Sequence, residues 1–310
     1  MSLVEQAGPA PPAFPMIKLH GIFPPIATPF DHKGGLYSVK VRHNIEKWNK
    51  TPLAGYAVCG STGESVYLTT EEKIKMWEWV AEYADSSKIL IAGTGVESVR
   101  ETVALTNQAA ELGYKVAMVR TPHYYKNLLN RPEAQALYFR AVADQSKLPL
   151  MIYNWPQATG LDIMPEAVAM LSEHPNIIAI KESSGSLEKV MQMIRETKAG
   201  FQVLTGSAPT LGPSLAVGCV GAVLAFANAA PYATVSIWEA HRTRETAAAL
   251  DWQNRIARGA HLVTTKYGIP GLKHAMDLNG YYGGPPRLPL GPVNPAQQQE
   301  IQQAFDGIKG

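Results

Sequence analysis

Residues 177–185 read Ile-Ile-Ala-Ile-Lys-Glu-Ser-Ser-Gly, an apolar run that ends in a lysine and passes directly into a polar turn. One segment earlier, residues 150–156 read Leu-Met-Ile-Tyr-Asn-Trp-Pro, an apolar run that ends in a tyrosine. Apolar runs without strict alternation are typical of parallel strands buried on both faces. If these two strands are neighbours in a parallel barrel, Lys181 and Tyr153 open onto the face where such barrels carry their active sites.

The same pattern occurs eight times along the chain and predicts the fold. The apolar runs cover residues 21–26, 55–59, 89–92, 116–119, 150–153, 177–181, 201–204 and 222–225. Most intervals between them have room for a helix, so we expect an α/β fold of the (β/α)₈ TIM-barrel type, which typically needs about 250 residues. A doubly wound open sheet is the alternative, but no Gly-x-Gly-x-x-Gly opens a helix after the first run.

The chain of 310 residues is longer than a bare barrel, and we expect three parts. Residues 1–15 are rich in proline and alanine and are expected to form a disordered N-terminal arm. Residues 16–231 are expected to form the barrel. Residues 232–310 are expected to form a C-terminal helical extension packed on the barrel, with extra helices over 232–258 and about 260–280. Inside the barrel, Thr69 with Glu72 predicts a capping box, and Pro165 predicts the first turn of another helix.

Composition and charge disfavour several classes of function. The chain is 46% hydrophobic and 17% charged, and its net charge of +2 comes without a long basic run, which disfavours nucleic acid as a partner. No apolar run is long enough to cross a membrane, and no signal or transit peptide is recognisable. The two cysteines, Cys59 and Cys219, are expected to be buried free thiols in a reducing, cytoplasmic compartment. The scattered histidines form no close ligand cluster, so no metal is expected.

Lys181 is the first candidate for covalent chemistry. Side chains alternate along a strand, so Lys181 should point with Ala179 and Ile177, while Glu182 points away and is a poor ion-pair partner. A free lysine is almost fully protonated at neutral pH, but burial lowers its pKa and makes it a nucleophile that can attack a ketone. The alternative is a lysine that snorkels at the strand end or binds an anion. Tyr153 could relay protons or could be a core residue with a solvated hydroxyl.

A polar turn follows the second apolar run. Residues 60–65 read Gly-Ser-Thr-Gly-Glu-Ser and place two hydroxyls and several backbone amides at the expected catalytic face. Such a turn can form an amide nest for a carboxylate, or it can be a plain tight turn. It is not a phosphate-binding P-loop, because the Gly-Lys-Ser/Thr ending is missing.

Taken together, three motifs resemble one family. They are Gly-Ser-Thr-Gly-Glu at 60–64, Tyr-Asn-x-Pro at 153–156 and Ile-Lys-Glu-x-Ser-Gly at 180–185. In this order they resemble the dihydrodipicolinate synthase/N-acetylneuraminate lyase family, whose members are (β/α)₈-barrel class I aldolases and related lyases acting on pyruvate-type substrates. The likeness runs from about Gly21 to the C-terminus. It implies an enzyme that forms a Schiff base with a 2-oxo acid such as pyruvate and needs no cofactor.

The resemblance also implies a role for each matching residue. Lys181 matches the Schiff-base lysine, and Tyr153 matches the proton-shuttling tyrosine, with Thr62 tying it into a hydrogen-bond chain. Ser61 and Thr62 match the hydroxyl pair that binds the substrate carboxylate. Tyr124 matches a tyrosine lent to a neighbouring subunit, although His123 departs from the commoner tyrosine, so a homotetramer built as a dimer of dimers is expected. The other implied substrate-binding positions are Ser183, Gly206, Ser207 and Val223.

The sequence indicates less directly which member of this family the chain resembles. Residues 159–162, 268–273 and 276–285 resemble 4-hydroxy-2-oxoglutarate aldolase, which releases pyruvate and glyoxylate. Ala158 stands where dihydrodipicolinate synthases carry an arginine for the aldehyde's carboxylate, and Ser207-Ala208 replaces an acidic pair. Trp155 either narrows the pocket or lines it for an aromatic aldehyde. The alternatives are a dihydrodipicolinate synthase, which condenses pyruvate with aspartate semialdehyde, a sugar-acid aldolase or dehydratase, and a non-catalytic barrel that binds an oxo acid.

Overall fold

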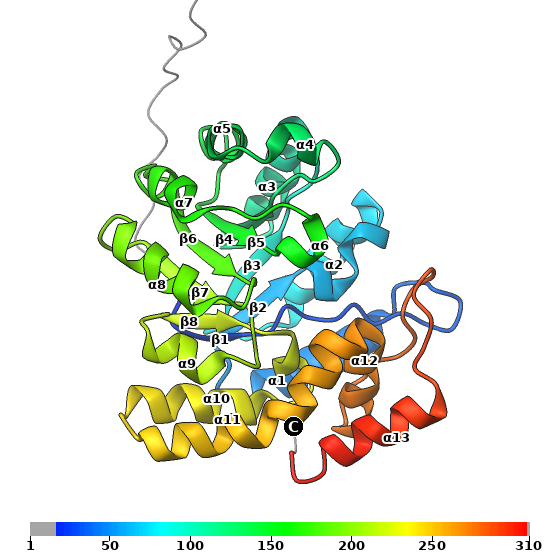
Figure 1. Ribbon diagram of the computed structural model, residues 1–310. Coiled ribbons are helices and arrows are strands. Elements are labelled where there is room, and N and C mark those ends of the chain that lie inside the picture. The colour runs from blue at the N-terminus through cyan, green and yellow to red at the C-terminus, as the bar shows by residue number, and fades with distance from the viewer. Residues whose placement is uncertain (1–16, 309–310) are drawn as a thin grey trace, which may run out of the picture.

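The computed structural model describes residues 17–308, and its centre is a barrel of eight parallel strands (Figure 1). The strands are β1 (Gly21–Phe23), β2 (Gly55–Val58), β3 (Ile89–Gly93), β4 (Val116–Arg120), β5 (Leu150–Asn154), β6 (Ile177–Glu182), β7 (Gln202–Thr205) and β8 (Gly221–Val223). They pair in the order β1-β8-β7-β6-β5-β4-β3-β2, so each strand lies beside its neighbours in the sequence.

Backbone hydrogen bonds between the β1 and β2 segments close the barrel. The amide of Ala54 donates to the carbonyl of Ile22, and the amide of Ala57 to that of Pro24, both at 2.9 Å. The amide of Ile26 donates back to the carbonyl of Ala57 at 2.9 Å. The predicted TIM barrel is therefore confirmed, and the open sheet is excluded.

Helices on the outside of the barrel connect the strands. They are α1 (Ser38–Asn49), α2 (Thr70–Tyr83), α3 (Val99–Glu111), α4 (Lys126–Leu129), α5 (Pro132–Ala143), α6 (Pro156–Thr159), α7 (Pro165–Ser172), α8 (Leu187–Glu196) and α9 (Leu211–Ala216). Short 3₁₀ turns add η1 (Ser61–Gly63), η2 (Ser65–Tyr67) and η3 (Ala225–Asn228). The two predicted helix starts are confirmed: Thr69 and Glu72 form a capping box at α2, and Pro165 opens α7.

The C-terminal helices pack along one side of the barrel, beside α1 and α9 (Figure 1). They are α10 (Pro231–Arg242), α11 (Thr246–His261), the π-turn η4 (Leu262–Lys266), α12 (Gly268–Leu278) and α13 (Pro295–Ala304). Residues 232–258 are helical as expected but form two helices, because the chain breaks at Arg244, whose φ of 63° lies in the left-handed region. Helix α13 was not predicted, although Asn294 and Gln297 form a capping box at its start. The arm predicted over residues 1–15 lies outside the described residues.

Two layers of apolar side chains fill the protein, and strand alternation decides which layer each residue joins. The inner layer, inside the barrel, includes Phe23, Ala57, Ile91, Val116, Met118, Met151, Tyr153, Ala179, Leu204 and Val223. The outer layer lies between the strands and the helices. Cys59 and Cys219 are buried free thiols, as expected.

No helix within residues 17–308 is long and apolar enough to cross a membrane. Across the same residues, no group of three or more His, Cys, Asp or Glu side chains could hold a metal ion.

Candidate active site

Three polar side chains stand in one row at the carboxyl ends of β4, β5 and β6. Arg120 pairs in register with Tyr153, and Tyr153 pairs in register with Lys181. Each follows an inward-facing residue by two positions, namely Met118, Met151 and Ala179. Because side chains alternate along a strand, all three point into the mouth of the barrel.

One detail of the predicted alternation was wrong. Ile177 packs in the outer layer instead of pointing inward with Lys181. The cause is a shift of register between β5 and β6: Leu150 pairs with Ile177, but Met151 already pairs with Ala179. Only the last part of β6 therefore keeps the alternation that aims Lys181 inward.

The Lys181 amine is buried and lies against an aromatic ring. Its side chain is 4% exposed, and Nζ lies 3.9 Å from the centre of the Tyr153 ring. Burial lowers the pKa of Lys181 from its ordinary value of 10.5 to about 7. At pH 7 about half of the amine is then neutral, compared with about one part in three thousand for a free lysine. The amine is thus available as a nucleophile in neutral solution.

Glu182 does not neutralise Lys181, because it lies on the opposite face of β6. Its carboxylate accepts a hydrogen bond from Asn154 Nδ2 at 2.8 Å and lies 3.5 Å from the amine of Lys189. Lys189 also pairs with Asp162. This network locks the ends of β5 and β6 together from outside the barrel. Among residues 17–308, Lys181 has no carboxylate partner, as the sequence predicts.

Tyr153 connects Lys181 to the polar turn after β2. Burial raises the pKa of Tyr153 to about 12, while a hydrogen bond with the Ser61 side chain and the charge of Arg120 act in the opposite direction. Trp155 stacks beside it, with ring centres 6.3 Å apart and planes inclined by 14°. The side chain that bonds to the Tyr153 hydroxyl is therefore that of Ser61. Thr62, for which the resemblance implied this link, is the next residue of the turn and is buried.

The turn η1 offers backbone donors at the barrel mouth. The amides of Gly63 and Glu64 bond to the carbonyls of Gly60 and Ser61 and close the turn. The amides of Ser61 and Thr62 precede these bonds, and such leading amides find no acceptor inside a helical turn. They are suited to hold a carboxylate.

A buried ion pair holds this turn in place. Glu64 has a φ of 55°, in the left-handed region, and its carboxylate lies 2.7 Å from the amine of Lys273 in α12. Both side chains are at most 1% exposed. Lys273 also donates to the carbonyl oxygens of Thr28 and Pro285, both at 2.9 Å. The C-terminal helices thus support the polar turn directly.

Gly206 and Ser183 lie beside Lys181. A Cβ at Gly206 would lie 1.9 Å from Ser183 Oγ and 3.0 Å from Lys181 Cε, so only glycine fits there. Ser183 Oγ is buried and has no hydrogen-bond partner among the described residues. Val223 lines the same inner layer, and Ser207 is half-buried in the loop after β7.

Tyr124 does not join the other predicted site residues of its own chain. It is 76% exposed, and its ring packs edge-on against Tyr125, with centres 5.1 Å apart. Its expected place in a neighbouring subunit's site stays a prediction.

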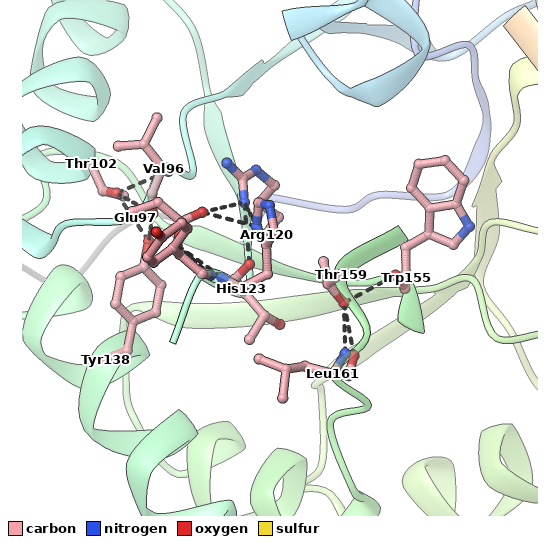
Figure 2. A network of polar contacts seen from close by, with 11 residues as sticks. Val96, Glu97, Thr102, Arg120, His123, Tyr138, Trp155, Thr159 and Leu161 are labelled. Carbon is pink, nitrogen blue, oxygen red and sulfur yellow. Dashed lines mark hydrogen bonds and ion pairs between the residues drawn. The ribbon is translucent and has the colours of Figure 1, made fainter. Parts of the chain in front are cut away.

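The structure adds one residue that the sequence reasoning missed. Arg120 contacts both Glu97, from the loop after β3, and His123, from the loop after β4 (Figure 2). The sequence pattern that points to Lys181 also points to Arg120, because this cationic residue directly follows the apolar run of residues 116–119.

A small cleft opens between the ends of β2, β3, β4 and β5. Gly60, Ser61, Met118, Arg120 and Tyr153 help to line it.

Comparisons with known proteins agree on one family. The model of the Dihydrodipicolinate synthetase family matches residues 18–307. A 4-hydroxy-tetrahydrodipicolinate synthase from Methanothrix thermoacetophila is 38% identical over 291 residues, which cover 92% of this chain and 95% of that protein.

Solved structures give the same result. A dihydrodipicolinate synthase from Bacillus anthracis superposes with a TM-score of 0.90 at 28% identity, covering 95% of this chain and 100% of that chain. YagE, an E. coli K12 prophage protein of the dihydrodipicolinic acid synthase family solved in complex with pyruvate, gives 0.86 at 28% identity, covering 94% of this chain and 98% of that one.

Proposed function

Because the chain belongs to the Dihydrodipicolinate synthetase family and is an enzyme of the class I aldolase type, we propose that Lys181 forms its Schiff base with pyruvate-type 2-oxo acids. The observation that carries this proposal is the buried Lys181 amine, which has a pKa of about 7 and lies 3.9 Å from the Tyr153 ring centre. A nucleophilic lysine needs this combination of burial and access to a proton carrier.

The geometry supports a Schiff-base reaction. Neutral Lys181 Nζ adds to the C2 ketone, and loss of water gives a protonated imine. In the cleavage direction a base removes the proton of the C4 hydroxyl, the C3–C4 bond breaks, and its electron pair moves through C2 to the imine nitrogen. The enamine then takes a proton at C3, and water releases pyruvate and regenerates the lysine. Tyr153, beside Lys181 and Ser61, is placed to carry these protons.

The substrate carboxylate has a separate place in this proposal. The leading amides and hydroxyls of Ser61 and Thr62 hold it, supported from below by Glu64 and Lys273. Ser183 Oγ is buried beside Lys181 and has no hydrogen-bond partner in the described part of the chain, so it can bond to the bound oxo acid. Gly206 and Val223 form the wall around the pyruvyl group, and Ser207 lies at its edge. Tyr124 is proposed to complete the site of a neighbouring subunit in a homotetramer.

Two reactions compete for this site. The names of the relatives support condensation of pyruvate with aspartate semialdehyde, the reaction of a 4-hydroxy-tetrahydrodipicolinate synthase. Ala158, which puts no cation in the loop after β5, and the likeness of residues 268–285 to 4-hydroxy-2-oxoglutarate aldolase support cleavage of a 4-hydroxy-2-oxo acid. A sugar-acid substrate has no specific support in the site.

The test compares kcat/KM for the two reactions on one preparation. Condensation is followed with pyruvate and aspartate semialdehyde, and cleavage is followed as pyruvate release from 4-hydroxy-2-oxoglutarate. An advantage of tenfold or more identifies the physiological direction. If neither reaction proceeds and pyruvate forms no imine, the proposed function is wrong.

A further inference from the structure

Arg120 has the position of a ligand-binding cation. Its side chain is 17% exposed, it lines the cleft with Ser61 and Tyr153, and its backbone pairs with that of Tyr153. Two strand spacings of about 4.8 Å separate the Cα atoms of Arg120 and Lys181. Since both side chains point into the barrel mouth, they face the two sides of Tyr153. A short acid bound to Lys181 can therefore extend toward Arg120.

The guanidinium keeps donors for a ligand. Within residues 17–308, its polar contacts all run through Nη1: Glu97 Oε1 at 3.2 Å, the Thr121 carbonyl at 3.4 Å and His123 Nδ1 at 2.6 Å. Nε and Nη2 therefore keep their hydrogen atoms for another acceptor. Paired donors of one guanidinium match the two oxygen atoms of a carboxylate.

Glu97 and His123 hold the guanidinium in place. His123 Nδ1 lies 2.6 Å from Arg120 Nη1 and 2.9 Å from Glu97 Oε1, so the three side chains form one cluster. Glu97 Oε2 accepts the backbone amides of His123 and Tyr124 at 2.9 and 3.0 Å. The carboxylate therefore fixes the loop after β4 as well as Arg120.

The loop that carries Glu97 is itself held by side chains of α3 and α5. The Tyr138 hydroxyl donates to the Val96 carbonyl at 2.9 Å and lies 3.0 Å from Thr102 Oγ1 (Figure 2). Thr102 and Tyr138 are buried, so the support is rigid. Arg120 is thus held before any ligand arrives, which is the arrangement of a binding residue.

We propose that Arg120 binds the carboxylate of the aldehyde fragment, opposite Lys181, and that Glu97 and His123 are its positioning residues. The proposal rests on the proposed function and names a substrate class: 2-oxo acids whose far end carries a second carboxylate. Ala158 leaves the loop after β5 without a cation for this group, and Arg120 supplies one from β4. Glyoxylate and aspartate semialdehyde both carry such a carboxylate, at different distances from the new bond.

The test uses unreactive analogues that form the imine but cannot be cleaved. 2-Oxoglutarate and 2-oxopentanoate have five carbons and differ in the second carboxylate, as 2-oxopimelate and 2-oxoheptanoate do with seven. Each is titrated as a competitor of pyruvate. In Arg120→Met the two diacids should lose about ten- to a hundredfold in affinity, and the two monoacids less than threefold. The diacid that loses more identifies the length of the natural substrate.

Further variants separate binding from structure. Arg120→Lys keeps the charge without the paired donors and should recover only part of the diacid preference. Glu97→Gln should raise KM for the diacid substrate and leave kcat within threefold. Arg258→Met, in α11 away from the cleft, is the matched control and should change nothing.

Two results would overturn the proposal, and a third would overturn the proposed function. Equal losses for diacids and monoacids would mean that Arg120 acts through Tyr153 or the polar turn. Unchanged affinities in Arg120→Met would make the arginine a structural ion-pair partner, and both results overturn the proposal. If the unmodified enzyme forms no imine with pyruvate, the proposed function fails instead, and this outcome is distinguishable because it precedes any difference between the analogues.

Discussion

Replacing Lys181 by methionine should stabilise the protein while it removes activity. The amine has an ordinary pKa of 10.5 in the unfolded chain and about 7 when folded, so at neutral pH the folded protein must release a proton or bury a charge. At 1.36 kcal/mol per pKa unit the difference between 10.5 and about 7 corresponds to about 5 kcal/mol, and relaxation and water penetration around the buried charge reduce it to about 2–4 kcal/mol. Methionine has a similar length and fills the same apolar space against Tyr153 without this cost.

The sign of the pH dependence follows from proton binding. Between pH 7 and 10.5 the unfolded chain carries a proton on Lys181 that the folded protein lacks, so the stability of the unmodified enzyme rises with pH in this window. The advantage of Lys181→Met should therefore be full at and below pH 7 and shrink toward pH 10.5.

The assay is urea unfolding of both proteins at pH 7 and pH 9.5, at one protein concentration because association also shifts apparent stability. Lys189→Met is the matched control: it removes a partner from the buried Glu182 and should destabilise the protein by about 1–3 kcal/mol. If Lys181→Met is destabilised at pH 7, or its advantage does not depend on pH, the amine is not held neutral by burial.

Three further predictions concern the other parts of the site. Tyr153→Phe should keep the fold and the imine but slow C–C chemistry about 10²–10⁴-fold, measured by single-turnover kinetics, and near-normal turnover would remove its proton-transfer role. Lys273→Met should destabilise the protein by about 3–5 kcal/mol and raise KM for pyruvate, because Glu64 is left buried without its cation. Adding Glu64→Gln to this variant should recover part of the stability and part of the affinity for pyruvate. If neither urea unfolding nor KM changes in Lys273→Met, the ion pair does not support the polar turn. Dilution to a monomer in sedimentation should abolish activity if Tyr124 completes a neighbour's site, whereas a fully active monomer would refute that role.

The row of strand-end residues explains what could be read from the sequence. Lys181 and Tyr153 were found because apolar strands end there abruptly, and the barrel turns each strand end into a position at its mouth. Arg120 carries the same signal but belongs to no motif of the family, and only the register of β4 against β5 shows that it stands beside Tyr153.

Contacts between distant segments could not be predicted in this way. Glu97 and Arg120 meet because two loops converge, and Lys273 reaches Glu64 across about two hundred residues of chain. The inward direction of Ile177 was wrong because a register shift is not visible in one strand's pattern. The place of Tyr124 depends on a partner subunit and stays a prediction.

Borohydride trapping shows directly whether Lys181 is the nucleophile. The enzyme is incubated with pyruvate, reduced, digested and mapped by mass spectrometry, with Lys189→Met and Lys181→Met treated in parallel. We expect one reduced pyruvyl adduct, on Lys181, that persists in Lys189→Met and is absent from Lys181→Met. An adduct on another lysine, or none in the unmodified enzyme, would contradict it.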